Sequence, residues 1–246
     1  MSLRTYCDEM KFCLDTNPDK LEFEDVRELD SYFSEYNEYQ KREHPIDYIP
    51  AHNTVAISAP NPTLTHLDME GVRNPQKYIG GIGLHISHHT GCHFVAKNKN
   101  YSNTAIVEKL CDLYKKRRIV TNIDLRTDYL HGTDIAAGTN YGVNTNGDER
   151  YTTKLMSICD KHGIKVTIDY TTPKGVSHIA KTLRSLSYRL NRENPHLYCL
   201  HLVVNKKLIL EQVDDITLER FRAFLYAMNE YVEMLDTTNK KLQLLP

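Results

Sequence analysis

The chain has 246 residues, with 31 basic and 32 acidic side chains and a formal net charge of -1. A nearly neutral charge excludes a protein that binds a polyanion over its whole surface, and the sequence has no apolar run near the roughly 18 residues that a membrane span requires. The first fifteen residues carry acidic side chains where a secretion signal would be apolar, so we expect a soluble, cytoplasmic protein with no membrane partner.

The first 43 residues are predicted to form an acidic helical segment. Leu21, Val26 and Leu29 belong to an apolar pattern with a period close to 3.6 residues. Residues 1–50 hold 13 acidic and 6 basic side chains, so the rest of the chain carries the basic excess. This asymmetry is compatible with a partner surface and equally with a chance distribution on a solvated surface.

Short strands are predicted next. Residues 53–58 form one of them. Residues 78–87 are rich in glycine and aliphatic side chains and predict a strand, and Thr90 with Gly91 predicts a two-residue turn. Residues 92–97 would then return as the second strand of a hairpin.

The second half of the chain alternates between strand and helix patterns. Predicted strands are residues 118–125, 164–170 and 197–204, and predicted helices are residues 103–114, 149–163, 175–191 and 221–235. A long loop rich in Gly, Asn and Thr covers residues 131–148. We predict an α/β (or α+β) fold with a mixed sheet, alternating strand–helix units in residues 118–236, and a single domain whose core spans residues 52–236.

A dense histidine cluster occupies the predicted hairpin, because five of the twelve histidines fall within residues 66–93. A two-residue turn would place His88 opposite His93, with Cβ atoms about 5 Å apart, close enough to share a metal ion. His85 and His89 would lie on the other face, about 13 Å apart along the strand and too far apart to share one.

This cluster predicts a metal site or an acid–base site. A catalytic zinc ion uses three protein ligands and one open position. We predict that a divalent metal ion is held by His88, His93 and Asp68. The predicted catalytic residues, as ligands or as general acids and bases, are His85, His88, His93, Asp124 and His131. The alternative is a strand surface that is simply rich in histidine.

Two further features predict contacts to a phosphate group. The helix predicted at residues 175–191 has a basic side, which suits phosphates or an acidic partner. The glycine-rich loop at residues 131–148 follows a strand, where ligands bind in open α/β sheets. The predicted substrate-binding residues are Lys181, Arg184, Tyr188, Arg192 and Asn140. A solvated helix face and a flexible surface loop are the alternatives.

Cysteine usage indicates a reducing compartment. Six cysteines are scattered without a Cys-x-x-Cys pair, namely Cys7, Cys13, Cys92, Cys111, Cys159 and Cys199. This spacing is typical of reduced thiols in a protein core.

Two short motifs resemble known families. Residues 80–86, with the sequence Gly-Gly-Ile-Gly-Leu-His-Ile, resemble the glycine-rich, histidine-bearing strand of the primase–polymerase superfamily, and Asp68, Glu70 and Asp124 stand in the order of that family's acidic residues. The interval between the acidic pair and His85 is too short for the helix that the family inserts there.

The order Asp128, His131 and His201 resembles the zinc amidases that cleave cell-wall peptides. The helix predicted from Glu149 ends at Gly163, several residues too early for that family. We therefore assign the chain to neither family.

Two functions remain open. The first is a histidine-centred, metal-dependent enzyme that acts on a phosphate-containing substrate, a nucleotide or nucleic acid, by phosphodiester hydrolysis or phosphoryl transfer. The second is a non-catalytic binding or assembly protein, in which the acidic N-terminal segment and the basic helix contact a partner or a second copy in a homo-oligomer. Convergence of the clustered histidines with Asp68, Asp124 or His131 would favour catalysis, and dispersal would favour binding.

Overall fold

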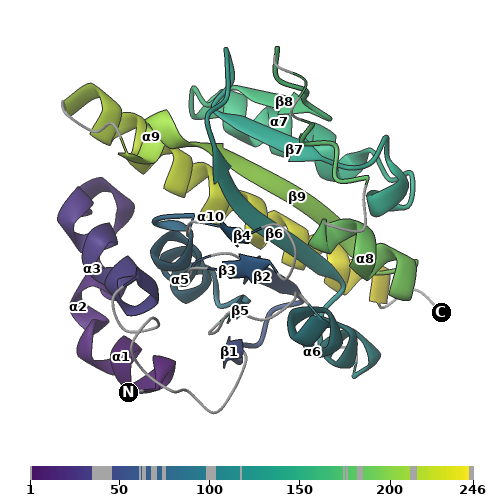
Figure 1. Cartoon of the computed structure of the whole chain (residues 1–246), viewed down its shortest axis with the longest axis horizontal. Helices are drawn as coiled ribbons and strands as arrows, with labels where there is room; N and C mark the ends of the chain where they lie inside the picture. The colour runs from purple at the N-terminus through teal and green to yellow at the C-terminus, as the bar shows by residue number, and fades with distance from the viewer. Residues whose placement is uncertain are drawn as a thin grey trace.

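The computed structural model describes residues 2–34, 46–60, 62, 65–67, 71–73, 76–97, 104–116, 118–173, 175, 177–181, 185–210 and 215–243. In this part of the chain a seven-stranded sheet has the order β1-β5-β2-β6-β9-β7-β8 (Figure 1). Its strands are β1 (Ile46–Ile49), β2 (Val55–Ala59), β5 (His93–Lys97), β6 (Thr121–Asp128), β7 (Ile135–Gly138), β8 (Val166–Ile168) and β9 (Tyr198–Asn205). A separate pair is formed by β3 (Thr65–Leu67) and β4 (Gly71–Arg73).

The centre of the sheet is parallel and contains a switch in connection direction. Strands β5, β2, β6 and β9 run parallel, whereas β1 and β7 are antiparallel to their neighbours β5 and β9. The chain passes from β2 to β5 on one side and then returns to β6 on the other side of β2. This reversal places a topological switch point between β2 and β6, which is where open α/β sheets bind ligands at the carboxyl ends of their strands.

Helices cover both faces of the sheet, which confirms the predicted mixed α/β class (Figure 1). They are α1 (Leu3–Glu9), α2 (Lys11–Asp15), the 3-10 helix η1 (Pro18–Lys20), α3 (Phe23–Ser34), α5 (Ile79–Thr90), α6 (Thr104–Lys115), the 3-10 helix η2 (Val143–Thr145), α7 (Arg150–Lys161), α8 (Leu186–Glu193), α9 (Lys206–Leu210) and α10 (Asp215–Gln243). Helices α3, α5, α7 and α10 share one core with the first face, and α6 and α8 share a smaller core with the second.

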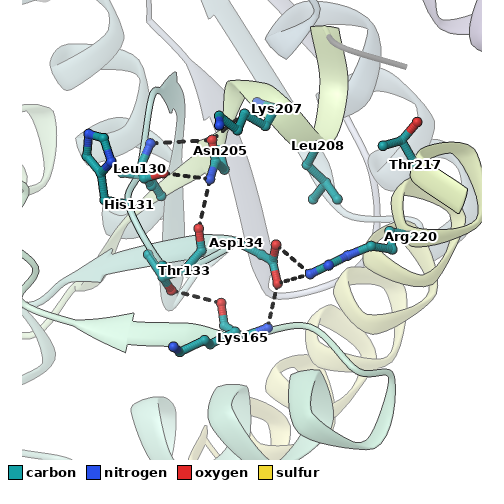
Figure 2. Close-up of a pocket in the computed structure, with 11 residues that line it drawn as sticks. Leu130, His131, Thr133, Asp134, Lys165, Asn205, Lys207, Leu208, Thr217 and Arg220 are labelled. Carbon is teal, nitrogen blue, oxygen red and sulfur yellow. Dashed lines mark hydrogen bonds and ion pairs between the residues drawn. The ribbon is translucent and has the colours of Figure 1, made fainter. Parts of the chain in front are cut away.

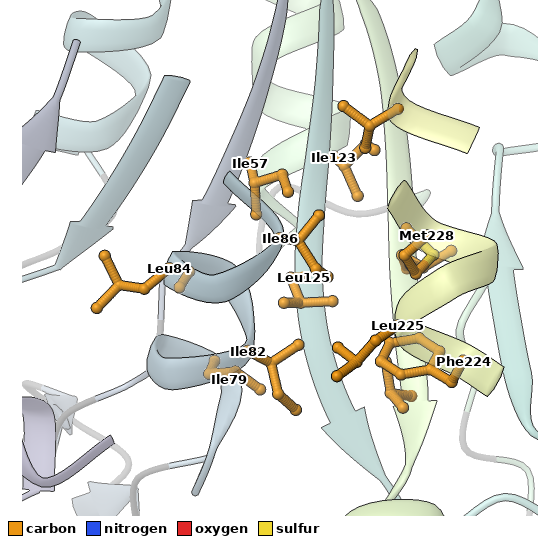
Figure 3. Close-up of a cluster of buried hydrophobic side chains, with 14 of the residues drawn as sticks. Ile57, Ile79, Ile82, Leu84, Ile86, Ile123, Leu125, Phe224, Leu225 and Met228 are labelled. Carbon is orange, nitrogen blue, oxygen red and sulfur yellow. The ribbon is translucent and has the colours of Figure 1, made fainter. Parts of the chain in front are cut away.

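The larger core lies between α5, α10 and the central strands (Figure 3). Ile82 and Ile86 of α5 meet Leu125 of β6 in this core, and Leu225 of α10 approaches from the other side. All four side chains are almost completely buried. Each contributes on the order of 2 kcal/mol by leaving water, so α5 is fixed against the sheet by its apolar side chains.

The segment predicted as the first strand of a histidine hairpin is instead helix α5, and that prediction was wrong. Its glycines permit close packing, because a Cβ atom on Gly80 would overlap the ring of Phe33, and one on Gly83 would overlap the ring of Phe94. This packing outweighs the low helix propensity of glycine, roughly 1 kcal/mol per residue. Gly91, at φ 66°, ends the helix in the left-handed region and is not a hairpin turn.

The acidic N-terminal segment is helical where it is described and packs against α5. Asp30 of α3 is 3% exposed and caps α5, because its carboxylate accepts from the backbone N–H groups of Tyr78 at 2.7 Å and Gly81 at 3.2 Å. Burial raises the pKa of Asp30 to about 6, against the lowering effect of these hydrogen bonds.

Two further predictions were wrong in part. The loop predicted at residues 131–148 contains β7, because the apolar run Ile135–Gly138 pairs with both β9 and β8. The helix predicted at residues 175–191 forms only from Leu186 in the described residues, and Ser177 instead makes an antiparallel bridge with Thr171.

The remaining predicted elements are found close to their predicted bounds, except that α10 (Asp215–Gln243) extends well beyond the predicted residues 221–235 at both ends. Strand β2, strand β9, helix α6, helix α7 and helix α10 all occur where their patterns indicated. All six cysteines are unpaired thiols. Among the described residues, no helix combines the length and the apolar character needed to cross a bilayer.

Candidate active site on the central strands

A row of residues crosses the sheet at the switch point. Ser58 of β2 lies opposite Asp124 of β6, Asp124 lies opposite His201 of β9, and His201 lies opposite Gly138 of β7. Paired residues in a sheet point to the same face, and neighbouring strands are about 4.8 Å apart. These four residues, which we call the switch-point row, therefore form a line on one face of the sheet.

The local sequence explains why this row is polar. Two residues earlier on each strand, the same face carries Ala56, Asn122 and Cys199. Ala56 and Cys199 belong to the small core under α6 and α8. The two helices thus cover the amino-terminal half of this face, and the ionisable side chains begin where that core ends.

Asp124 is the electrostatic centre of the site. Its side chain has no exposed surface, and its carboxylate contacts Arg126 Nε at 2.8 Å and His201 Nδ1 at 3.0 Å. Burial by itself would raise the pKa of Asp124, but Arg126 and His201 outweigh burial and the pKa lies below its ordinary value. Asp124 is therefore an anion held between two nitrogen groups.

The hydrogen bond to Asp124 determines how His201 can act. A carboxylate anion accepts hydrogen bonds, so His201 Nδ1 carries a proton and its N–H donates a hydrogen bond to Asp124. The other ring nitrogen, Nε2, is then able to accept a proton in the neutral ring. The side chain of His201 is 13% exposed, which leaves it partly accessible.

Ser58 does not complete a nucleophile triad. It accepts a hydrogen bond from Asn122 Nδ2 at 3.0 Å, and Ser58 Oγ donates to the carbonyl oxygen of Ile123 at 3.4 Å. Two strand spacings, about 10 Å, separate it from His201. A Ser–His hydrogen bond of the kind used in serine hydrolases is therefore absent between these two described residues.

His178 covers the far end of the switch-point row. A Cβ atom on Gly138 would overlap the backbone oxygen of His178, so a glycine is needed for this segment to cross β7. Within the described part of the chain, the buried His178 Nε2 makes no hydrogen bond, although Asp128 Oδ2 is 3.5 Å away. Burial lowers the pKa of His178, Asp128 opposes this, and the nearby His201 adds to the lowering.

The clustered histidines of α5 do not join this site. His85 Nε2 and His89 Nε2 both lie 3.1 Å from the backbone oxygen of Thr16, and His88 Nε2 lies 2.8 Å from Asp15 Oδ1. Burial is the main reason that the pKa of His85 falls to about 4. These histidines dock the N-terminal segment onto α5, so the predicted separation of His85 and His89 by 13 Å was wrong.

His88 and His93, the predicted ligand pair, lie on different elements, α5 and β5, and contact different partners. His93 Nδ1 is 2.9 Å from the hydroxyl of Tyr48 and 3.1 Å from the backbone nitrogen of Ala51. Asp68, the third predicted ligand, lies outside the described residues. Within the described part of the chain, no group of three or more His, Cys, Asp or Glu side chains is arranged to hold a metal ion.

The predicted substrate-binding residues are dispersed. Tyr188 and Arg192 lie on α8, Lys181 is exposed before it, and Arg184 falls outside the described residues. Asn140 lies in a turn at φ 55° and donates its backbone N–H to Ile179. Their role in substrate binding stays a prediction.

Of the predicted catalytic residues, Asp124 belongs to the switch-point row and His131 lines a separate cavity. The sequence did not mark Arg126 or His178 as site residues, and it pointed to His201 only through the order of residues that resembles the zinc amidases. The alternation of Asp124, Arg126 and Asp128 is a signal that could have been used, because it places three charges on one strand face. His201 lies beside Asp124 because β9 is next to β6 in the sheet. The alternation along one strand does not reveal the order of the strands.

Comparisons with known proteins agree on the fold. No protein-family model matches the chain, and no curated protein matches it by sequence. N-formylglutamate amidohydrolase from Ralstonia eutropha superimposes with a TM-score of 0.55 at 10% identity over 80% of this chain and 98% of that one. Gene product Atu2144 from Agrobacterium tumefaciens gives a TM-score of 0.49 at 12% identity over 85% and 99%. At such identities the likeness concerns the fold.

Proposed function

We propose that the chain is a hydrolase that cleaves an amide bond, with His201 as the general base and Asp124 as the carboxylate that orients it. The observation that carries this proposal is the hydrogen bond between these two side chains, which lie midway along the adjacent parallel strands β6 and β9, next to the switch point between β2 and β6. The choice of an amide, in place of the phosphate ester predicted from the sequence, is supported by the likeness in fold to N-formylglutamate amidohydrolase.

The proposed reaction begins with a water molecule next to His201 Nε2. As the water oxygen attacks the carbonyl carbon, its proton passes to Nε2, and Asp124 stabilises the imidazolium that forms. His201 then donates the proton to the amide nitrogen, the C–N bond breaks, and a carboxylic acid and an amine leave. Proton transfer of this kind contributes about 10² to 10⁴ in rate.

His178 and Arg126 have supporting roles in this proposal. Among the described residues, His178 Nε2 is buried without a hydrogen bond, 3.5 Å from Asp128 Oδ2, so we assign His178 to closing the far end of the row. Arg126 is 7% exposed and holds Asp124 through Nε. Its charge keeps Asp124 ionised, which preserves the orientation of His201.

The carboxylate of Asp124 offers no free oxygen to a divalent metal ion. Both carboxylate oxygens of Asp124 are engaged, one by Arg126 and one by His201. A guanidinium at 2.8 Å from the carboxylate also places a positive charge where a cation would bind. No step of the proposed reaction uses a metal ion.

An amine-release assay tests the proposal. Wild-type protein is incubated with N-formylglutamate and with a panel of N-acyl amino acids, and we expect turnover of at least one of them. His201→Gln should lower kcat by about 100-fold or more. His196→Gln is a matched control, because His196 is exposed just before β9, and it should retain full activity. Absence of turnover across the panel, or equal activity of His201→Gln and wild type, would refute the proposal.

A further inference from the structure

A polar cavity separate from the switch-point row lies near the carboxyl edge of the sheet. It has a volume of about 420 Å³ and is lined by residues 130–134, Lys165, Asn205, Lys207, Leu208, Thr217 and Arg220 (Figure 2). Asn205 lies four residues beyond His201 on β9, about 13 Å along the strand. None of the described lining residues belongs to the switch-point row, so this cavity is a different site.

The wall of the cavity is held in place by buried hydrogen bonds. Asn205 is 6% exposed, and its Nδ2 donates to the carbonyl oxygens of Leu130 at 3.0 Å and Thr133 at 2.8 Å. Its Oδ1 accepts from the backbone N–H groups of Leu130 and Lys207 at 3.3 and 3.2 Å. One buried amide therefore ties the β6–β7 connection to the start of α9, which fixes the cavity shape before any ligand arrives.

The charges of the cavity are mainly positive. Asp134 is the one acidic side chain among the described lining residues, and both of its oxygens are bound by Arg220 at 2.7 and 2.6 Å. Lys165 and Lys207 are exposed, and the described part of the chain gives neither ammonium group an ion-pair partner. With Asp134 neutralised by Arg220, two uncompensated positive charges remain.

We propose that this cavity binds a small dianion, a phosphate group or a dicarboxylate, through Lys165 and Lys207. The volume lies at the lower end of the range for small-molecule sites, roughly 300–1,000 Å³. Two lysine charges match a dianion, and lysine is a mobile point charge that suits phosphate and carboxylate oxygens. The proposal is independent of the reaction assigned to His201.

Calorimetric titration of the full chain tests this binding. The probes are inorganic phosphate, glutarate as a dicarboxylate, and acetate as a monoanion, all at low ionic strength because screening weakens exposed charge pairs. We expect a dissociation constant in the millimolar range or tighter for at least one dianion, and weaker binding of acetate. The dianion with the lower dissociation constant identifies which chemical class the cavity prefers.

Matched double variants assign the binding to this cavity. Lys165→Gln with Lys207→Gln should weaken dianion binding at least about 10-fold, without changing the thermal midpoint, since both side chains are exposed. Lys11→Gln with Lys20→Gln removes the same charge from another exposed surface and should leave binding unchanged. The proposal is wrong if neither dianion binds wild type below about 10 mM, if the cavity variant binds like wild type, or if the control variant weakens binding equally.

Discussion

Asp124 on β6 and His201 on β9 lie directly opposite each other in a parallel ladder, with His201 Nδ1 3.0 Å from Asp124 Oδ2. The other carboxylate oxygen receives Arg126 Nε at 2.8 Å. One fully buried carboxylate thus orients a histidine and a guanidinium at the same time. Stability and the proposed activity both depend on this carboxylate, and the two effects can be measured separately.

Asp124→Asn should destabilise the fold by about 3 kcal/mol, because a buried guanidinium loses an anionic partner. Urea unfolding of wild type and variant measures the difference. Asp112→Asn is the comparison, since Asp112 pairs with Lys116 on an exposed helix surface, where ion pairs contribute little. A loss for Asp124→Asn no larger than that for Asp112→Asn would show that the buried pair does not stabilise the fold.

Asp30 should make the protein less stable as the pH rises. Its pKa in the folded protein is about 6, against an ordinary value of 3.8, so the folded state favours the protonated carboxyl. The resulting stabilisation is complete below pH 3.8 and is lost as the pH rises through 6, by about 3 kcal/mol in total. Asp30→Asn keeps an oxygen that can cap α5 and removes the titration.

The measurement for Asp30 is the free energy of unfolding at several pH values between 3.5 and 7. The free energy of unfolding of Asp30→Asn, relative to that of wild type, should increase steadily from pH 3.5 to pH 7. If the difference in free energy of unfolding between the two proteins stays constant, Asp30 does not titrate in this pH range.

His93 should have the opposite pH dependence. Burial is the main reason that its pKa falls from 6.5 to about 4, so the folded state favours the neutral ring. The stabilisation is present above pH 6.5 and is lost as the pH falls through 4, by about 3 kcal/mol. His93→Asn keeps an oxygen that accepts from Tyr48 but has no titrating ring. The free energy of unfolding of this variant should therefore decrease less than that of wild type as the pH falls. His196→Asn, on an exposed histidine, should leave the curve as it is in wild type.

Gly80→Ala should destabilise the fold by about 2 kcal/mol or more, because the added methyl group overlaps the ring of Phe33. Phe33→Leu in the same chain provides space and should recover part of the loss. Thermal unfolding of the single and double variants measures both effects. If the alanine variant is as stable as wild type, α5 and α3 are not packed as closely as described.

The sequence predicts the elements that carry a clear period. Helix α10 has Phe221, Phe224 and Leu225 at helical spacing, and strand β9 is an apolar run of strand length. Helix α5 was missed because its glycines look like strand and turn residues locally. They are required by Phe33 and Phe94, which are distant in sequence, so tertiary packing overrides the local preference.

Of the residues in the candidate site, Asp124 could be predicted from the sequence. Asp124 is an acidic residue inside an apolar strand, and this exception marks it from the sequence. His201 is its partner because β9 is the neighbour of β6, a fact of strand order that no local pattern contains. The density of histidines in α5 instead suggested a site there, although His85 and His89 bind the carbonyl oxygen of Thr16.

A double-mutant cycle on Asp124 and His201 tests the central proposal most directly. The cycle compares kcat/KM for amide hydrolysis by wild type, Asp124→Asn, His201→Gln and the double variant. If Asp124 acts through His201, the double variant should be about as slow as His201→Gln, since residues that act as a unit are not additive. If the two losses instead multiply, or if His201→Gln hydrolyses the amide as fast as wild type, Asp124 and His201 do not form the reacting pair.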